Sequence, residues 1–137
     1  MYYWGKSVPQ NFAEAMKWYR KAAKQGDADA QVKLGTMYVE GEGVPQNFAE
    51  AIKWYRKAAE QGNADAQFNL GTMYAKGKGT PKNFINAYVW LSVASTKGYG
   101  DAKDNLEIVS SQMTPQQIAQ AQKEAAELWE KINKSKK

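Results

Sequence analysis

A tandem repeat of 36 residues dominates this sequence. Residues 44–79 read VPQNFAEAIKWYRKAAEQGNADAQFNLGTMYAKGKG, and they match residues 8–43 at all but eight of the 36 positions. Residues 80–113 keep part of the pattern, including the Asn-Phe pair and a tryptophan in register. Because each unit of such a protein must bury its apolar face against the neighbouring units, the repeat predicts a linear array stacked along one axis.

Each unit predicts a pair of antiparallel α-helices. In the first unit, apolar residues recur at helical spacing over residues 11–25 and again over residues 28–40. Asn11 with Glu14 predicts a capped helix start, and Gly26 followed by Asp27 predicts the end of one helix and the start of the next. The second unit repeats this pattern over residues 47–61 and 64–76. Gly35 recurs as Gly71 in the middle of a helix, which indicates a close approach of two helices.

Both ends of the array depart from the pattern. Residues 1–7 correspond to the end of a repeat, so we expect a truncated half-repeat and an uncapped N-terminal end that can self-associate. Residues 80–113 form a divergent unit, in which Glu107 and Ser110 stand where earlier units have glycine and tyrosine. Thr114, Pro115 and Gln117 predict the start of a capping helix over 114–134, followed by a disordered tail over 135–137.

The composition excludes several classes of chemistry. The sequence has no cysteine and no histidine, which removes disulfides, zinc–thiolate sites and the commonest general base. The carboxylates are scattered and the serines lack a histidine to activate them, so we expect no enzymatic activity, no metal and no cofactor. The net charge of +5 is spread along the sequence rather than concentrated, which argues against nucleic acid as a partner.

No apolar run reaches the roughly 20 residues of a membrane span, and the N-terminus has no signal-peptide pattern. Because the sequence starts within a repeat, cytoplasmic and periplasmic or secreted locations both stay open.

The spacing of small, glycine and aromatic residues resembles one known family. The pattern A-x-x-x-L-G-x-M-Y-x-x-G-x-G-V-P-x-N-x-x-x-A-x-x-W-Y-x-K-A-A-x-x-G, over residues 30–62, resembles the Sel1-like repeat, a relative of the tetratricopeptide repeat. The resemblance covers about residues 1–106, and the segment 87–132 is similar to the C-terminal end of bacterial members. It implies an all-α, right-handed α-solenoid of antiparallel helix pairs and an adaptor role in binding peptides or proteins on a concave face.

The resemblance also implies where a partner would bind. In tetratricopeptide repeats the first helix of each pair lines the groove, and alignment on the Leu-Gly pairs at 34–35 and 70–71 transfers that surface to this protein. The expected groove positions are Asp29, Val32, Thr36, Val39, Glu40, Asp65, Phe68, Thr72, Ala75 and Lys76. Four of the eight differences between the two units fall on this side of the helix, as a recognition surface allows. Freely drifting solvent positions are the alternative, and an exposed Phe68 is the strongest expected anchor.

Two further features have less specific interpretations. Trp18, Trp54 and Trp90 recur at helical spacing, which favours a place in the core over a stacking platform for bases or sugars. The glycine loops at 41–43 and 77–79 follow no strand and precede no G-K-[ST], which excludes a phosphate-binding loop. Acidic residues surround the first loop and basic residues surround the second. Three interpretations of this difference stay open: the loops are simply solvated, they attract each other weakly, or they bind a charged partner.

The function expected from these observations is a scaffold that binds a protein or peptide in the concave face. The alternative is a structural or oligomerising segment of a larger protein, exported or host-interacting among the options, without a groove of its own.

Overall fold

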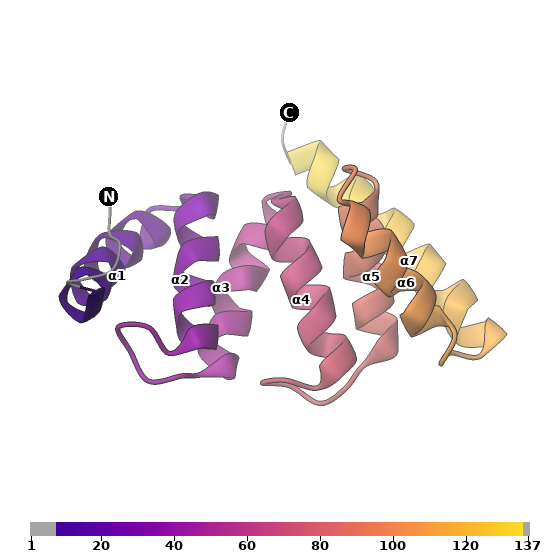
Figure 1. Cartoon of the computed structure of the whole chain (residues 1–137). Coiled ribbons are helices and arrows are strands. Elements are labelled where there is room, and N and C mark those ends of the chain that lie inside the picture. Colours follow the sequence, from indigo (N-terminus) through magenta and orange to yellow (C-terminus); the bar gives the residue numbers. More distant parts are fainter. Residues whose placement is uncertain (1–7, 136–137) are drawn as a thin grey trace.

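The computed structural model describes residues 8–135, and this part of the protein consists of seven α-helices without a strand (Figure 1). The helices are α1 (Val8–Lys24), α2 (Ala28–Glu40), α3 (Phe48–Glu60), α4 (Ala64–Lys76), α5 (Phe84–Ser95), α6 (Gly100–Ser110) and α7 (Pro115–Ser135). From α1 to α6, each helix packs against the next one in the sequence, and the result is the predicted all-α solenoid of helix pairs. The expected half-repeat at 1–7 and residues 136–137 of the expected tail lie outside the described residues.

Local signals in the sequence set the helix boundaries. Asn47 accepts a hydrogen bond from the backbone nitrogen of Glu50 at 3.0 Å, and Asn83 caps α5 in the same way. At the other end, Gly41 adopts a left-handed conformation with φ +70°, which lets its amide bond the carbonyl of Met37 and close α2. Gly77 repeats this geometry after α4. The recurrence of these caps every 36 residues reproduces the same hairpin in each unit.

Two mid-helix glycines hold the helix pairs close together. An added Cβ on Gly35 would lie 2.8 Å from the ring of Tyr55 on α3, and one on Gly71 would lie 2.9 Å from Leu91 on α5. Both distances are shorter than packed carbon atoms tolerate, so a side chain at either position would push the helices apart. The close approach inferred from the two glycines is therefore confirmed.

The first helix begins earlier than expected. α1 starts at Val8, so Asn11 lies within the helix rather than at its N-cap. In the later units, a backbone hydrogen bond anchors the loop before the helix. The amide of Asn47 donates to the carbonyl of Tyr38 at 2.9 Å, and the amide of Asn83 donates to that of Tyr74 in the same way. The counterpart carbonyl for Asn11 belongs to Tyr2, outside the described residues. Pro9 is compatible with the first turn of a helix, where its missing amide hydrogen costs nothing.

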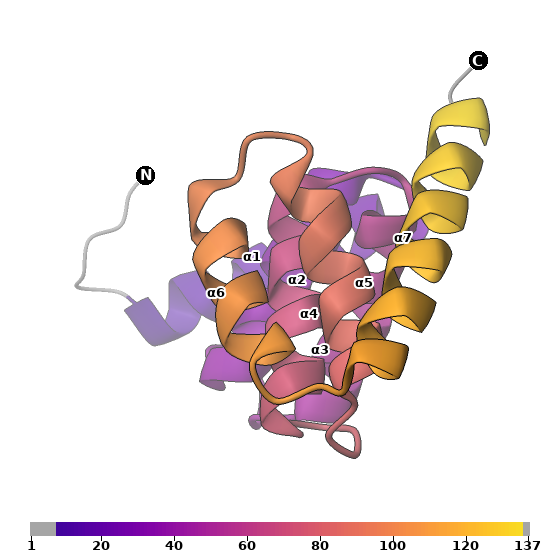
Figure 2. The same ribbon diagram turned by 90° about the vertical axis from the view of Figure 1, so that its right-hand side faces the viewer.

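The last helix does not continue the stacking order. α7 packs against α5, and Figure 2 shows α6 and α7 on opposite sides of α5. Glu107 on α6 stands where Gly35 and Gly71 admit the following helix, so α6 lacks the glycine that allows this close approach in the earlier pairs. Thr114 and Gln117 form the predicted capping box, with backbone-to-side-chain bonds of 2.9 and 3.1 Å. With α4, α6 and α7 around it, α5 is apolar on all sides.

The three repeated tryptophans do not share one environment. Trp54 and Trp90 are buried as predicted, each with 6% of its surface exposed, whereas Trp18 is 57% exposed, so the expectation of a core position for Trp18 is wrong. Trp54 faces α1 across a cavity that it lines together with Ala23 and Lys24. The helix that would cover Trp18 in the same way would have to precede α1, and the described residues contain none.

Candidate functional site

The ten expected groove positions lie on α2 and α4, and none of them is fully buried. The four charged residues of this set are exposed, namely Asp29, Glu40, Asp65 and Lys76, and the other six are half-buried. The residues between them on the same helices, such as Leu34, Tyr38 and Leu70, belong to the core. The alignment therefore selected the solvent-facing sides of these two helices, which is where a partner could reach them.

One part of this surface is hollowed. A cavity of about 180 Å³ opens between α2 and α4, with α3 beneath it, and three of the expected residues line it: Val39, Thr72 and Lys76. Five residues that the alignment did not select complete the lining, namely Phe48, Tyr55, Asn69, Met73 and Lys78. The expected residues near the start of the helices, among them Asp29 and Asp65, do not line this cavity.

A polar atom in this cavity lacks a partner. In the first unit, Thr36 and Tyr55 share a hydrogen bond of 2.8 Å between their hydroxyls. In the second unit, Leu91 stands at the position equivalent to Tyr55 and cannot make that bond, so the buried hydroxyl of Thr72 has no partner within residues 8–135. A buried hydroxyl without a hydrogen bond costs free energy, and a ligand group that bonds it would recover that cost.

The Tyr55 hydroxyl is not a reactive group. Burial raises the pKa of Tyr55, the bond to Thr36 opposes that effect, and the negative charge of Glu40 adds to it. Tyr55 therefore stays neutral near neutral pH and offers a hydrogen-bonding hydroxyl at the floor of the cavity.

The charges at the two ends of the surface have opposite signs. Lys76 and Lys78 stand at the cavity beside the end of α4, and the Lys78 ammonium lies 5.3 Å from the centre of the Phe48 ring. Glu40 and Glu42 lie beside the end of α2, where burial and the neighbouring Glu40 raise the pKa of Glu42. A partner that crosses this surface would meet a negative end and a positive end.

Phe68 is not the exposed anchor that we expected. It is half-buried and stacks on Tyr99, with ring centres 4.8 Å apart and an interplanar angle of 15°. In the preceding unit the equivalent positions hold Val32 and Asn63, so both members of the contact changed together. The difference between the units at position 68 therefore reflects repacking between neighbouring units rather than a free recognition surface.

The alignment did not select Tyr55, Asn69 or Lys78. Tyr55 lies on α3 and Lys78 follows α4, outside the aligned helices, whereas Asn69 lies on α4 and belongs to the four differences on its open side. Tyr55 comes from the second helix of a pair, which the alignment did not use, and only 3% of its surface is exposed. A signal was present, since position 91, the equivalent of Tyr55, holds leucine. This change removes the hydroxyl partner from Thr72 in the unit where the cavity opens.

The described residues lack two other kinds of site. No group of three or more acidic residues between 8 and 135 is arranged to hold a metal ion. None of the helices in that range is long and apolar enough to cross a membrane.

Comparison with known families agrees with the geometry. The sequence model of the Sel1 repeat matches residues 1–27, 28–63 and 64–99. The chain belongs to the Sel1 repeat family. The matched repeats begin at the helix after the tight turn, so α2 and α3 form one repeat and α4 and α5 the next. Members of the family generally serve as protein-interaction scaffolds.

Two solved Sel1-type structures resemble this protein. One is c5321, a protective antigen present in uropathogenic Escherichia coli strains that displays an SLR fold, with a TM-score of 0.79 and 35% identity. The other is a Sel1 repeat protein from Oxalobacter formigenes, with a TM-score of 0.70 and 42% identity. The matches cover 89% and 73% of this sequence but only 28% and 41% of those proteins. Curated protein sequences gave no match.

Proposed function

We propose that this Sel1 repeat protein is a scaffold that binds a peptide or protein segment along the surface formed by α2 and α4. The observation that carries the proposal is the cavity of about 180 Å³ between these helices. Its floor offers the hydroxyls of Tyr55 and Thr72, and the second of these has no partner among the described residues. Peptide grooves commonly combine an apolar wall with a few polar groups that orient the ligand.

The charge distribution gives the bound segment a direction. An acidic side chain would lie beside Lys76 and Lys78, and a basic side chain would lie toward Glu40 and Glu42. An apolar side chain between them would enter the cavity against Val39. Complementary charges of this kind contribute mainly to the selection and orientation of a partner, while the apolar anchor supplies most of the affinity.

A peptide library displayed on phage tests the proposal. We expect the wild-type protein to enrich peptides that carry an acidic residue and, a few positions away, an apolar and a basic residue. Reversal of both lysines, Lys76→Glu with Lys78→Glu, should remove the binding of these peptides and select peptides with a basic residue at the acidic position. Lys123→Glu on α7 is the matched control and should leave the selected peptides unchanged.

Two results would contradict the proposal. The first is that the wild-type protein enriches no peptide above an unrelated helical protein. The second is that the enriched peptides bind the Lys76→Glu, Lys78→Glu variant as tightly as the wild type. Circular dichroism of the variant would show whether the helices are retained, and neither lysine is buried, so the fold should not change.

The exposure of Trp18 favours a second candidate, an oligomerising or structural segment. The indole lies on α1 at one end of the described array, where it is 57% exposed. A second copy, or a further repeat of a longer protein, would cover it by end-to-end stacking. Sedimentation velocity from about 1 to 100 μM tests self-association, for which we expect Trp18→Gln to lower the apparent mass at the highest concentrations. A mass that is the same for both proteins and independent of concentration would contradict it.

A further inference from the structure

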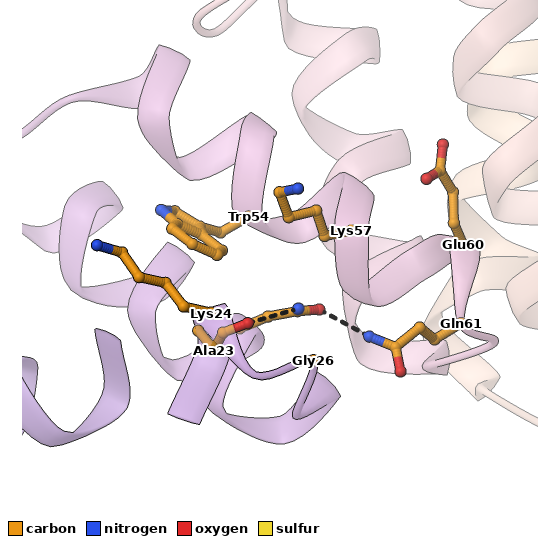
Figure 3. A pocket seen from close by; sticks show the side chains of 8 residues that line it. Ala23, Lys24, Gly26, Trp54, Lys57, Glu60 and Gln61 are labelled. Carbon is orange, nitrogen blue, oxygen red and sulfur yellow. Dashed lines mark hydrogen bonds between the residues drawn. The ribbon is translucent and has the colours of Figure 1, made fainter. Parts of the chain in front are cut away.

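A second cavity, of about 440 Å³, opens on a different part of the molecule (Figure 3). It lies between the C-terminal ends of α1 and α3, beside the first turn of α2, and shares no lining residue with the cavity between α2 and α4. The residues that carry the argument are Lys24, Gln31, Trp54, Lys57, Glu60 and Gln61.

The floor of this cavity is fixed by hydrogen bonds. Gln31 is buried, with 3% of its surface exposed, and it donates from Nε2 to the carbonyl of Ala23 at 3.0 Å. Its Oε1 accepts a bond of 3.0 Å from Nε2 of Gln61 (Figure 3). These two bonds hold the last turn of α1, the first turn of α2 and the end of α3 at fixed positions, so the cavity is already formed without a ligand.

Trp54 contributes an unused donor. The residue lines the cavity with only 6% of its surface exposed, yet its indole Nε1 has no hydrogen-bond partner among the described residues. A buried N–H without a partner is costly, and buried polar groups in folded proteins normally find one. The indole nitrogen can only donate, so the missing partner is an acceptor.

Two ammonium groups stand at the same cavity without an anionic partner. In Figure 3, Lys24 and Lys57 lie on either side of the Trp54 side chain, and the Lys24 ammonium ends on the side of the indole nitrogen. The Lys57 ammonium lies 6.0 Å from the centre of the indole. Neither Lys24 nor Lys57 forms an ion pair within residues 8–135. The salt bridge in this part of the protein joins Lys53 to Glu50. Glu60 is at the rim, but its carboxylate is turned away from both lysines.

The next unit of the array offers an internal comparison. It keeps part of the floor, with Gln67 bonded to the carbonyl of Ala59 at 3.0 Å and Trp90 buried at the position of Trp54. The second bond is lost, because Lys97 stands at the position of Gln61 and Oε1 of Gln67 has no partner among the described residues. The rim is different, because the positions equivalent to Lys24 and Lys57 hold Glu60 and Val93. The two cations are therefore specific to the cavity between α1 and α3 and are not a requirement of the repeat.

We propose that this cavity binds a carboxylate group of a partner polypeptide. The carboxylate would accept a hydrogen bond from the Trp54 indole on the side of the Lys24 ammonium, with the Lys57 ammonium across the indole ring. Ionised acceptors form shorter and stronger hydrogen bonds than neutral ones, and the two cations favour an anion over a neutral amide of the same shape. An acidic side group and the free C-terminus of a polypeptide share this chemistry, and the experiment below separates them.

The test is a nuclear magnetic resonance titration of the ¹⁵N-labelled protein that follows the indole N–H signals of its tryptophans. The signal of Trp54 is assigned with Trp54→Phe. Three short peptides serve as probes: acetyl-Ala-Glu-Ala-amide, acetyl-Ala-Ala-Ala with a free C-terminal carboxylate, and acetyl-Ala-Gln-Ala-amide. We expect one or both acidic peptides to shift the Trp54 signal in a saturable manner, while the glutamine peptide shifts it little and the Trp90 signal stays in place.

Variants of the rim show whether the lysines are responsible. Lys24→Gln and Lys57→Gln should each weaken the binding of the acidic peptide about 2- to 5-fold, as expected for partly exposed charges. Glu60→Gln removes a negative charge at the rim that would repel the carboxylate, and it should strengthen the binding by up to about 3-fold. Lys97→Gln, at the rim of the next unit, is the control and should have no effect.

The proposal is overturned if the acidic peptides do not shift the Trp54 signal more than the glutamine peptide does. It is also overturned if the shift persists unchanged in the double variant of Lys24 and Lys57. Both lysines are exposed, so the remaining amide signals should confirm that these variants keep their fold.

Discussion

The replacement of Gly71 by alanine tests the claim that helix pairs in this array depend on glycine. Alanine is favoured over glycine inside a helix by about 1 kcal/mol, so an isolated α4 would be stabilised by Gly71→Ala. In the folded protein the added Cβ would lie 2.9 Å from Cγ of Leu91 and 3.2 Å from the carbonyl oxygen of Ala87. Leu91 is fully buried, and the carbonyl belongs to the backbone of α5, so neither can move away easily.

The expected result is a net loss of stability. Overpacking of a close-packed core costs about 1–3 kcal/mol, and the position of Gly71 is at the upper end because a backbone atom is among the neighbours. After the gain in helix propensity, Gly71→Ala should lower the free energy of unfolding by about 1–2 kcal/mol. Urea unfolding followed by circular dichroism would report this as a lower midpoint with an unchanged slope.

Two further variants separate the steric cause from other effects. Leu91→Ala alone should cost about 2–5 kcal/mol, but in the Gly71→Ala background it should cost less, because it removes the atoms that the new methyl group meets. Gly100→Ala at the start of α6 is the control, since an added Cβ there meets no atom within 4 Å, and it should be neutral or stabilising. A stabilising Gly71→Ala, or additive effects of the pair, would refute the reasoning.

Three other predictions follow from single contacts. Trp18→Ser should change the free energy of unfolding by less than about 1 kcal/mol, whereas the equivalent Trp54→Ser should lower it by about 3–5 kcal/mol, as measured by urea unfolding. Thr114→Ala should cost about 1 kcal/mol in the same assay, because it removes the oxygen that caps the amide of Gln117. Burial raises the pKa of Tyr55 above its usual value near 10, so the neutral hydroxyl stabilises the fold below that pH, and the contribution is lost as pH rises through the folded-state pKa. The urea midpoint should therefore fall as pH rises above about 10, and less steeply in Tyr55→Phe.

The helix pairs were predictable because their signals are local and repeated. Asn47, Gly41 and the apolar spacing act within a few residues, and the 36-residue period shows each signal twice. The prediction failed at the edges, where the position of an element depends on its neighbours. Asn11 lies inside α1, which begins at Val8, and Trp18 is exposed because no described helix covers it.

The position of α7 shows the same limit at the other end. Its start and its capping box follow from Thr114 and Gln117, and both were predicted, whereas its end lies at Ser135, which the prediction placed in the tail. Its packing partner was not predicted, because the effect of glycine at the position of Glu107 becomes apparent only when Gly35 and Gly71 are seen against α3 and α5. The sequence pattern alone presents the replacement of glycine by glutamate as the end of the array. In the structure, the final helix packs on α5 instead of pairing with α6.

The differences between two nearly identical repeats fall into two kinds, according to whether the residues that they contact change with them. When a position changes and its neighbour in the next unit changes with it, as at Phe68 and Tyr99, the change preserves packing and says nothing about a ligand. When a position changes above a retained floor, packing does not require the change, and recognition becomes the better explanation. Lys24 meets this second condition above Gln31, whose bond to the carbonyl of Ala23 recurs between Gln67 and Ala59. Because sequence alone cannot say which residues touch across units, it could list the differences but could not separate these two kinds.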